Sequence, residues 1–178
     1  TGLPARRTAH SLLMEITGDG RLLAELIAGG ALAQLPNDDR ARAQRLATDT
    51  LRGLDRADRM LKPYLKKTPP DHVMNALRLG VIELCGGEAA HGVVNAYVEI
   101  VGRNKRTQAM KGLSNAVLRK IADEGPAGWA KRAVPLTPGW LRQPLVAAWV
   151  LVAVTGMEAS HFSGAPLVLS SKSDPAIV

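Results

Sequence analysis

The chain has 178 residues, which suggests one domain or one domain with an extension, and its 46% hydrophobic share is that of a globular protein rather than a disordered one. Aromatic residues make up only 3%, so aliphatic side chains must fill the core, and this composition favours helices. The net charge of +7 indicates a polyanionic partner, with nucleic acid as the first candidate and an anionic membrane as the second.

The ends of the chain and its single cysteine bear on location. The first ten residues, TGLPARRTAH, lack the apolar run of a signal peptide, and the longest apolar stretch, PLVAAWVLVAV, is too short to span a bilayer. One cysteine excludes an intramolecular disulfide and fits a reducing compartment. We therefore expect a cytoplasmic protein without membrane attachment, and the Thr at position 1 indicates a trimmed N-terminus.

Apolar residues at helical spacing predict the first two helices. LPARRTAHSLLMEIT carries Pro4, which suits a first helical turn, and the glycine-rich turn at 18–20 ends it. RLLAELIAGGALAQL has the same pattern and is expected to continue until Pro36.

Two further helices are expected at 37–53 and at about 56–67. Asn37 or Asp38 can cap the first of them, and Asp55 can cap the second. A pair of prolines follows the second helix and stops it, because proline cannot continue a helical hydrogen-bond ladder.

Three more helices follow in the second half of the helical region. DHVMNALRLGVIELCGG keeps an apolar stripe and closes at a pair of glycines. HGVVNAYVEI and KGLSNAVLRKI are joined by the basic connector GRNKRTQ, and each places an Asn-Ala pair near the start of its apolar run, at Asn95 and Asn115. Asparagine is a mediocre helix former because its amide competes with the backbone for hydrogen bonds, so both positions need a reason.

The character of the chain changes after residue 125. Short helical stretches then alternate with Pro and Gly, and the last part has one possible strand at 167–170. The sequence therefore predicts an all-α protein, with a helical bundle at 1–125 and an irregular extension at 126–178.

No motif for catalysis or metal binding is present. The sequence lacks a Walker loop and a GxGxxG after a strand, and its four histidines and one cysteine do not stand at metal-ligand spacing. Cys85 is interpreted as a small buried hydrophobe rather than a nucleophile, and His91 as a capping or packing residue. The three tryptophans all lie in the extension, and packing anchors are favoured over base-stacking platforms for them: Trp129, Trp140 and Trp149.

Positive charge is concentrated in two stretches. The stretch from 103 to 120 contains no Asp or Glu, and its cations are Arg103, Lys105, Arg106, Lys111, Arg119 and Lys120. The stretch from 52 to 67 is also basic, but Asp55 and Asp58 stand four residues before Arg59 and Lys62 and can pair with them on a helix. We therefore interpret the second stretch as a solvated helix face, with RNA binding as the alternative, and the first as the better nucleic-acid candidate.

Four segments, in order, resemble the NusB-like domain over residues 3–125. They are ARRTAHSLLMEI, RAQRLATDTLRGLDRADRMLKPYL, ALRLGVIELCGGEAAHGVVNAYVEIVGR and GLSNAVLRKI. This fold is an all-helical RNA-binding module. It occurs alone as the NusB transcription antitermination factor and at the N-terminus of the Sun/Fmu (RsmB-type) RNA cytosine-5 methyltransferases.

The extension resembles the linker of the methyltransferases, through LTPGWLRQPLVAAW and HFSGAPLVLSSKSDP. The resemblance implies a catalytic domain after Val178 with the S-adenosylmethionine site and a Pro-Cys motif, and a ribosomal RNA substrate. Neither motif is in this sequence, and Cys85 does not follow a proline, so we expect no catalytic residue and no cofactor in this chain. An antitermination factor and a helical protein–protein adaptor are the alternatives.

The resemblance also implies roles for individual residues. Arg6 and Arg7 fall in the family's N-terminal arginine motif on its RNA face, and the charge pattern adds Arg103, Lys105, Arg106 and Lys111. Asn95 and Asn115 match the family's paired helix asparagines, and we expect them to be buried structural pins rather than RNA contacts.

Overall fold

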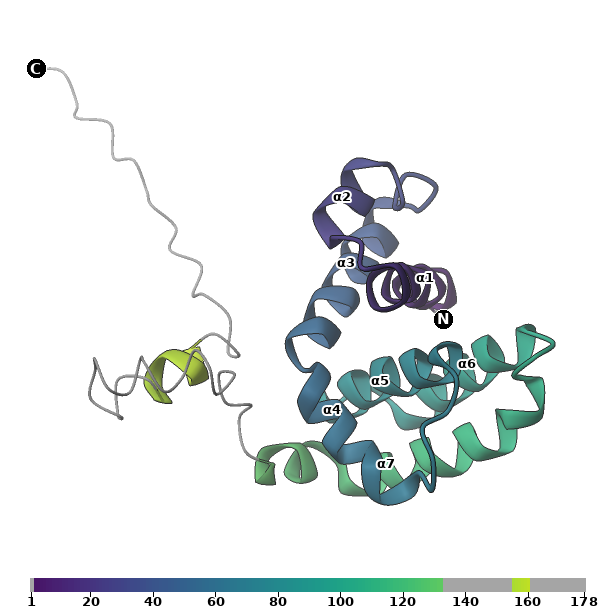
Figure 1. The fold of residues 1–178 in the computed structure, drawn as a ribbon, viewed down its shortest axis with the longest axis vertical. Coiled ribbons are helices and arrows are strands. Elements are labelled where there is room, and N and C mark those ends of the chain that lie inside the picture. Colours follow the sequence, from purple (N-terminus) through teal and green to yellow (C-terminus); the bar gives the residue numbers. More distant parts are fainter. Residues whose placement is uncertain (1, 133–154, 161–178) are drawn as a thin grey trace, which may run out of the picture. The chain divides into compact units, whose positions relative to one another are not determined.

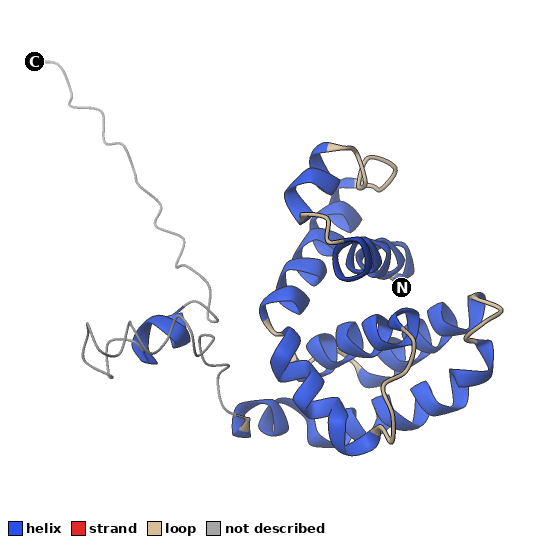
Figure 2. Ribbon diagram, in the orientation of Figure 1, coloured by secondary structure: helices blue, strands red, loops and turns tan. Residues whose placement is uncertain are grey.

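The computed structural model describes residues 2–132 and 155–160 (Figure 1). Contacts divide the chain into two compact units, Thr1–Ala133 and Val134–Val178. Figure 2 shows helices and loops but no strand in the described residues, which confirms the predicted all-α class. In the second unit the described residues form a short helix at 155–160, and the possible strand at 167–170 lies outside the described residues.

The first unit is a succession of α-helices with two short 3₁₀ turns. Their bounds are α1 (Leu3–Asp19), α2 (Leu23–Ala28), α3 (Asn37–Arg52), α4 (Leu54–Leu61), η1 (Lys62–Tyr64), α5 (Asp71–Cys85), α6 (Ala90–Arg103), η2 (Gln108–Met110) and α7 (Lys111–Lys131).

Helix ends agree with the sequence prediction for α1 and α5 and differ from it for α2 and α4. Helix α1 ends at Gly20 and α5 ends before Gly86, as expected. Helix α2 stops at Ala28 rather than near Pro36, because the chain turns at a Gly-Gly pair. Helix α4 gives way to η1 rather than running to 67, since Pro63 has no N–H to continue the ladder. Helix α3 begins without a side-chain cap.

Helix α5 is the centre of the bundle and packs against α1, α3, α4, α6 and α7 (Figure 1). It is buried on nearly every side, which explains its almost continuous apolar sequence. Gly80 lets α7 approach closely, since a Cβ there would lie 2.5 Å from a methyl carbon of Leu118. Side chains of α1 divide between this main core and a smaller core with α2 and α3, so α1 joins the two halves of the bundle.

Helix α7 continues past the expected domain boundary at 125. It kinks at Gly125, whose φ of 54° and ψ of −154° only glycine adopts readily, and Pro126 restarts the helix. The next turn then brings Trp129 against α4, where the Arg56 guanidinium lies 4.6 Å from the ring centroid and donates to the Trp129 carbonyl. Trp129 is thus a packing anchor, as predicted, whereas Trp140 and Trp149 lie outside the described residues.

Candidate nucleic-acid interface

A buried carboxylate organises the helices beneath the predicted arginine motif. Glu83 of α5 has a side chain that is 2% exposed, and it accepts two hydrogen bonds from Arg6, at 2.8 and 2.9 Å. Arg42 of α3 donates to the same carboxylate at 3.0 Å, and the Tyr97 hydroxyl of α6 donates at 2.6 Å. One carboxylate therefore connects four helices. Burial alone would raise the pKa of Glu83, but the bonds from Arg6, Tyr97 and Arg42 outweigh it and lower that pKa.

The prediction that Arg6 contacts RNA is wrong for this fold. Its side chain is 6% exposed and makes a bidentate ion pair with Glu83, so it cannot reach a phosphate without breaking that pair. Arg7 points elsewhere because successive helical residues are separated by about 100° around the axis, and Arg7 is exposed. The arginine motif thus splits into one structural residue and one surface residue.

The connector between α6 and α7 is a hydrogen-bonded turn rather than a loose loop. The side chain of Asn104 accepts a bond from the backbone N–H of Arg106 at 2.9 Å. The buried hydroxyl of Thr107 donates to the carbonyl of Val101 at 2.9 Å, and the Thr107 N–H donates to the Asn104 carbonyl at 3.0 Å. These bonds hold Lys105 and Arg106 outward, and both side chains are exposed.

A pair of histidines connects this turn to α1. The buried His10 donates from Nε2 to the backbone carbonyl of His72 at 2.8 Å, which fixes the proton on that nitrogen. The Nδ1 atom of His72 lies 3.4 Å from the hydroxyl of Thr107. Arg7 is exposed one helical turn before His10, and this spacing puts the two residues on neighbouring positions of the α1 surface. We call Arg7, Lys105, Arg106 and Lys111 the connector surface.

The histidine pair should make the fold acid-sensitive. Burial lowers the pKa of His10 to about 4 from its ordinary 6.5, and burial also lowers the pKa of His72. A lowered histidine pKa means that the unfolded chain binds the proton first, so stability falls as the pH drops below 6.5. The free energy of unfolding, measured with urea, should fall by about 2 kcal/mol between about pH 6.5 and 5. His10→Gln should flatten this dependence on pH. An equally steep profile in His10→Gln would contradict the assignment.

The remaining predicted cations differ in how their charge is used. Arg103 pairs with Glu99 one turn earlier, at 2.7 Å, and both side chains are about half exposed. The glutamate precedes the acid-free stretch, so Arg103 contributes less net charge than the sequence prediction assumed. Lys111 is exposed, and its stem crosses Gly102, where a Cβ would lie 2.7 Å from the lysine Cδ. Within residues 2–132 no ion pair joins a connector-surface residue to a carboxylate.

The prediction of two buried asparagine pins is wrong for Asn95. Its side chain is exposed and bonds only to His91 on its own helix, at 3.0 Å. Asn115 is half-buried and accepts a 3.3 Å bond from Arg119, also on its own helix. Each asparagine bonds to a partner four residues away on its own helix, so neither bond joins two helices.

The buried asparagine is instead Asn75 of α5, which is also followed by alanine. It is fully buried, and its amide donates to the hydroxyl of Thr17 in α1 at 2.9 Å. Its carbonyl oxygen accepts from Arg78 at 3.0 Å. The same Asn-Ala pattern in α5, which packs against five other helices, is the signal that sequence reasoning missed.

Replacing Asn75 with Ala should therefore lower the free energy of unfolding by about 1–3 kcal/mol, because it leaves buried partners unpaired. Asn95→Ala is the matched control on an exposed site and should stay within about 0.5 kcal/mol of wild type. Chemical denaturation of both variants checks the pair, and equal effects would show that burial does not decide their roles.

Neither Cys85 nor His91, the two residues weighed as catalytic candidates, lies in an environment typical of a catalytic group. Burial raises the pKa of Cys85 to about 11, and its thiol lies 3.6 Å from the sulfur of Met60, which supports a small core-facing residue. His91 is exposed in the first turn of α6. Among the described residues, no cluster of three or more metal-ligating side chains occurs, and no helix is long and apolar enough to cross a membrane.

The second basic stretch is only partly neutralised in the predicted way. Arg59 pairs with Asp55 at 2.9 Å, as expected. Asp58 does not pair with Lys62 but holds the guanidinium of Arg78 in two 2.7 Å contacts. Lys62 is thereby left on the surface without a carboxylate partner in residues 2–132.

Comparison with known proteins identifies the helical unit. A model described as the NusB family matches residues 3–123, nearly the whole of the 3–125 region that the sequence resemblance covered. No curated protein and no solved structure matches the chain. The RNA-binding character of the NusB domain fits the exposed cations around the connector. The matched region is more than half of the chain, and the chain therefore belongs to the NusB family.

Proposed function

We propose that the connector surface is where this NusB-family domain holds RNA. The observation that carries the proposal is the hydrogen-bonded turn that presents Lys105 and Arg106 outward beside α1. Long cationic side chains at an exposed turn reach phosphates without desolvating a core. The described part of the bundle has few aromatic side chains and both its tyrosines are at least partly buried, so electrostatic contacts dominate over base stacking.

We further propose that the chain is the non-catalytic, N-terminal part of an S-adenosylmethionine-dependent RNA 5-methylcytosine methyltransferase. The resemblance of 126–178 to the linker of those enzymes supports this setting over a free-standing antitermination factor. The sequence holds neither a Gly-rich nucleotide loop nor a Pro-Cys pair, so the proposal assigns methyl transfer to a domain outside residues 1–178. The helical unit positions RNA, with ribosomal RNA as the expected substrate.

Binding, gene sequence and activity each test the proposed function. Residues 1–178 should bind single-stranded RNA, and calorimetry should detect no tight S-adenosylmethionine binding by this chain. The gene should encode a further domain with a Pro-Cys motif, and its full product should methylate cytosine C5 in ribosomal RNA. RNA binding without a downstream domain would favour the antitermination factor, and the absence of RNA binding would favour the protein–protein adaptor.

A further inference from the structure

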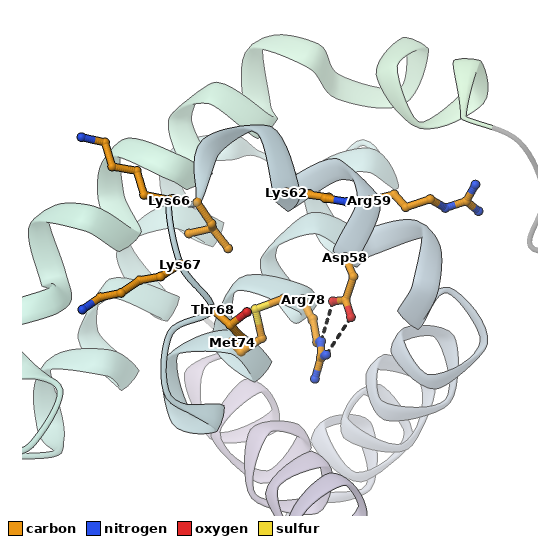
Figure 3. Close-up of a pocket in the computed structure, with 9 residues that line it drawn as sticks. Asp58, Arg59, Lys62, Lys66, Lys67, Thr68, Met74 and Arg78 are labelled. Atoms are coloured by element: carbon orange, nitrogen blue, oxygen red, sulfur yellow. Dashed lines mark hydrogen bonds and ion pairs between the residues drawn. The ribbon is translucent and has the colours of Figure 1, made fainter.

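A groove of about 390 Å³ lies between α4, the segment after η1, and α5 (Figure 3). We call it the lysine groove. Its lining residues are Asp58, Arg59, Lys62, Leu65, Lys66, Lys67, Thr68, Met74 and Arg78. The volume is within the range of about 300–1,000 Å³ that is usual for small-molecule sites, so the groove can take a ligand of nucleotide size.

The charge of the lysine groove is strongly positive. Five of its lining side chains are cationic and only Asp58 is acidic. Figure 3 shows Asp58 joined to Arg78, and this carboxylate is occupied by its two 2.7 Å contacts with the guanidinium. Lys62, Lys66 and Lys67 are exposed and have no carboxylate partner in residues 2–132. Their charge is therefore available to an anion.

The segment that carries these lysines is held by contacts at both of its ends. The hydroxyl of Tyr64 in η1 donates to Glu124 of α7 at 2.6 Å, and burial of Pro69 fixes the other end of the segment. Arg78 of α5 bonds to Asp58 of α4 and to Asn75 of its own helix. Asn75 bonds in turn to Thr17 of α1, so the groove residues are connected to α1. Ligand binding then has to order the lysine side chains but not the backbone that carries them.

We propose that the lysine groove binds one unstacked nucleotide of single-stranded RNA, with its phosphates held by Lys62, Lys66 and Lys67. The proposal rests on the RNA-binding function proposed above and adds a second contact region on the same domain. Leu65 and Met74 provide apolar surface for the ribose and base, and the exposed lysines stand at the edge of the groove, where their long side chains can turn toward a phosphate. Lysine ammonium groups bind phosphates as flexible point charges, which suits a backbone of variable path.

The shape of the site favours a single strand over other polyanions. A duplex keeps its bases stacked and offers no nucleotide for a groove, whereas single-stranded RNA can splay a base out. An acidic peptide would be gripped best by a bidentate arginine, and the guanidinium of Arg78 is already engaged with Asp58. The mixture of apolar floor and lysine rim therefore fits a nucleotide best.

The test uses residues 1–178, a fluorescent oligouridine, and the triple variant Lys62→Gln/Lys66→Gln/Lys67→Gln. Its matched control is Arg21→Gln/Arg45→Gln/Lys131→Gln, which removes the same charge from exposed positions outside the groove. The groove variant should lower the slope of log affinity against log salt by about two and weaken binding by roughly 10- to 100-fold at about 0.1 M salt. The control should change the slope little, and circular dichroism should show both variants folded.

Acylation of lysines provides a second measurement of binding, and it needs no substitution. Bound oligouridine should protect Lys66 and Lys67 of the wild-type chain from an amine-reactive ester, while Lys131 should stay reactive. Unchanged RNA affinity in the groove variant, with no protection, would overturn the groove while leaving the proposed function intact. Failure of the wild type to bind any RNA would overturn both. If an RNA duplex, or polyglutamate alone, protected Lys66 and Lys67 equally well, the assignment of the groove to a nucleotide of single-stranded RNA would be wrong.

Discussion

Glu83→Gln is expected to lower the free energy of unfolding by about 3–5 kcal/mol, because it leaves the charge of Arg6 buried and uncompensated. The carboxylate is 2% exposed and receives bonds from three other helices, so its loss disturbs α1, α3 and α6 together. Chemical denaturation followed by circular dichroism measures the effect. For a domain of this size such a loss would consume a large part of the total stability.

Glu88→Gln is the matched control for this prediction. Glu88 is 52% exposed and lies 3.9 Å from Arg42, at the edge of the same network. Its loss should stay within about 0.5 kcal/mol of wild type, since exposed ion pairs contribute little. A Glu83→Gln variant as stable as Glu88→Gln would show that the buried network does not hold the helices together.

Acid titration provides a second readout of Glu83. Its pKa in the folded chain is lowered below the ordinary 4.5, so the unfolded chain binds the proton first. Its stabilisation is therefore present above about pH 4.5 and is lost as the pH falls further toward the folded pKa. Glu83→Gln should remove this part of the acid unfolding, while the loss that begins near pH 6.5 from His10 should remain.

The fold could be predicted where local chemistry decides it. Pro4 at the start of α1 and the glycines that end α1 and α5 act through their own backbone preferences, and the structure agrees with all of them. The early end of α2 depended on how two glycines compete with helical neighbours, and the close approach at Gly80 depends on Leu118, 38 positions away in the sequence. Long-range packing of that kind is not visible in a local pattern.

The site was harder to predict because residues adjacent in the sequence differ in burial. Arg6 and Arg7 look alike in sequence, and only the position of Glu83 decides which one is buried. A lone acid within the apolar run VIELC was a signal that some cation must meet it, since an unpaired buried charge is costly. The sequence could not say which cation, and the same is true of Asn75, whose partner Thr17 comes from another helix.

Replacing the four cations of the connector surface with Gln should weaken RNA binding more than any other exposed change. The variant changes Arg7, Lys105, Arg106 and Lys111, which are all exposed. It leaves out Arg6, because Arg6 is buried against Glu83 and Arg6→Gln would report on folding rather than on RNA binding. If each cation touches a phosphate, the slope of log affinity against log salt should fall by about two to three units on a single strand. Affinity at about 0.1 M salt should then drop by on the order of 100-fold.

The same exposed triple, Arg21→Gln/Arg45→Gln/Lys131→Gln, separates local contacts from the general effect of lost positive charge. Long-range attraction is screened beyond about 10 Å at 0.1 M salt, so distant charges should alter the slope only slightly. An unchanged slope in the connector variant, with a reduced slope in the groove variant, would place the RNA along α4 and α5 instead. Reduced slopes in both would mean that one strand crosses both surfaces, and the two losses should then add, because separate phosphate contacts release counterions independently.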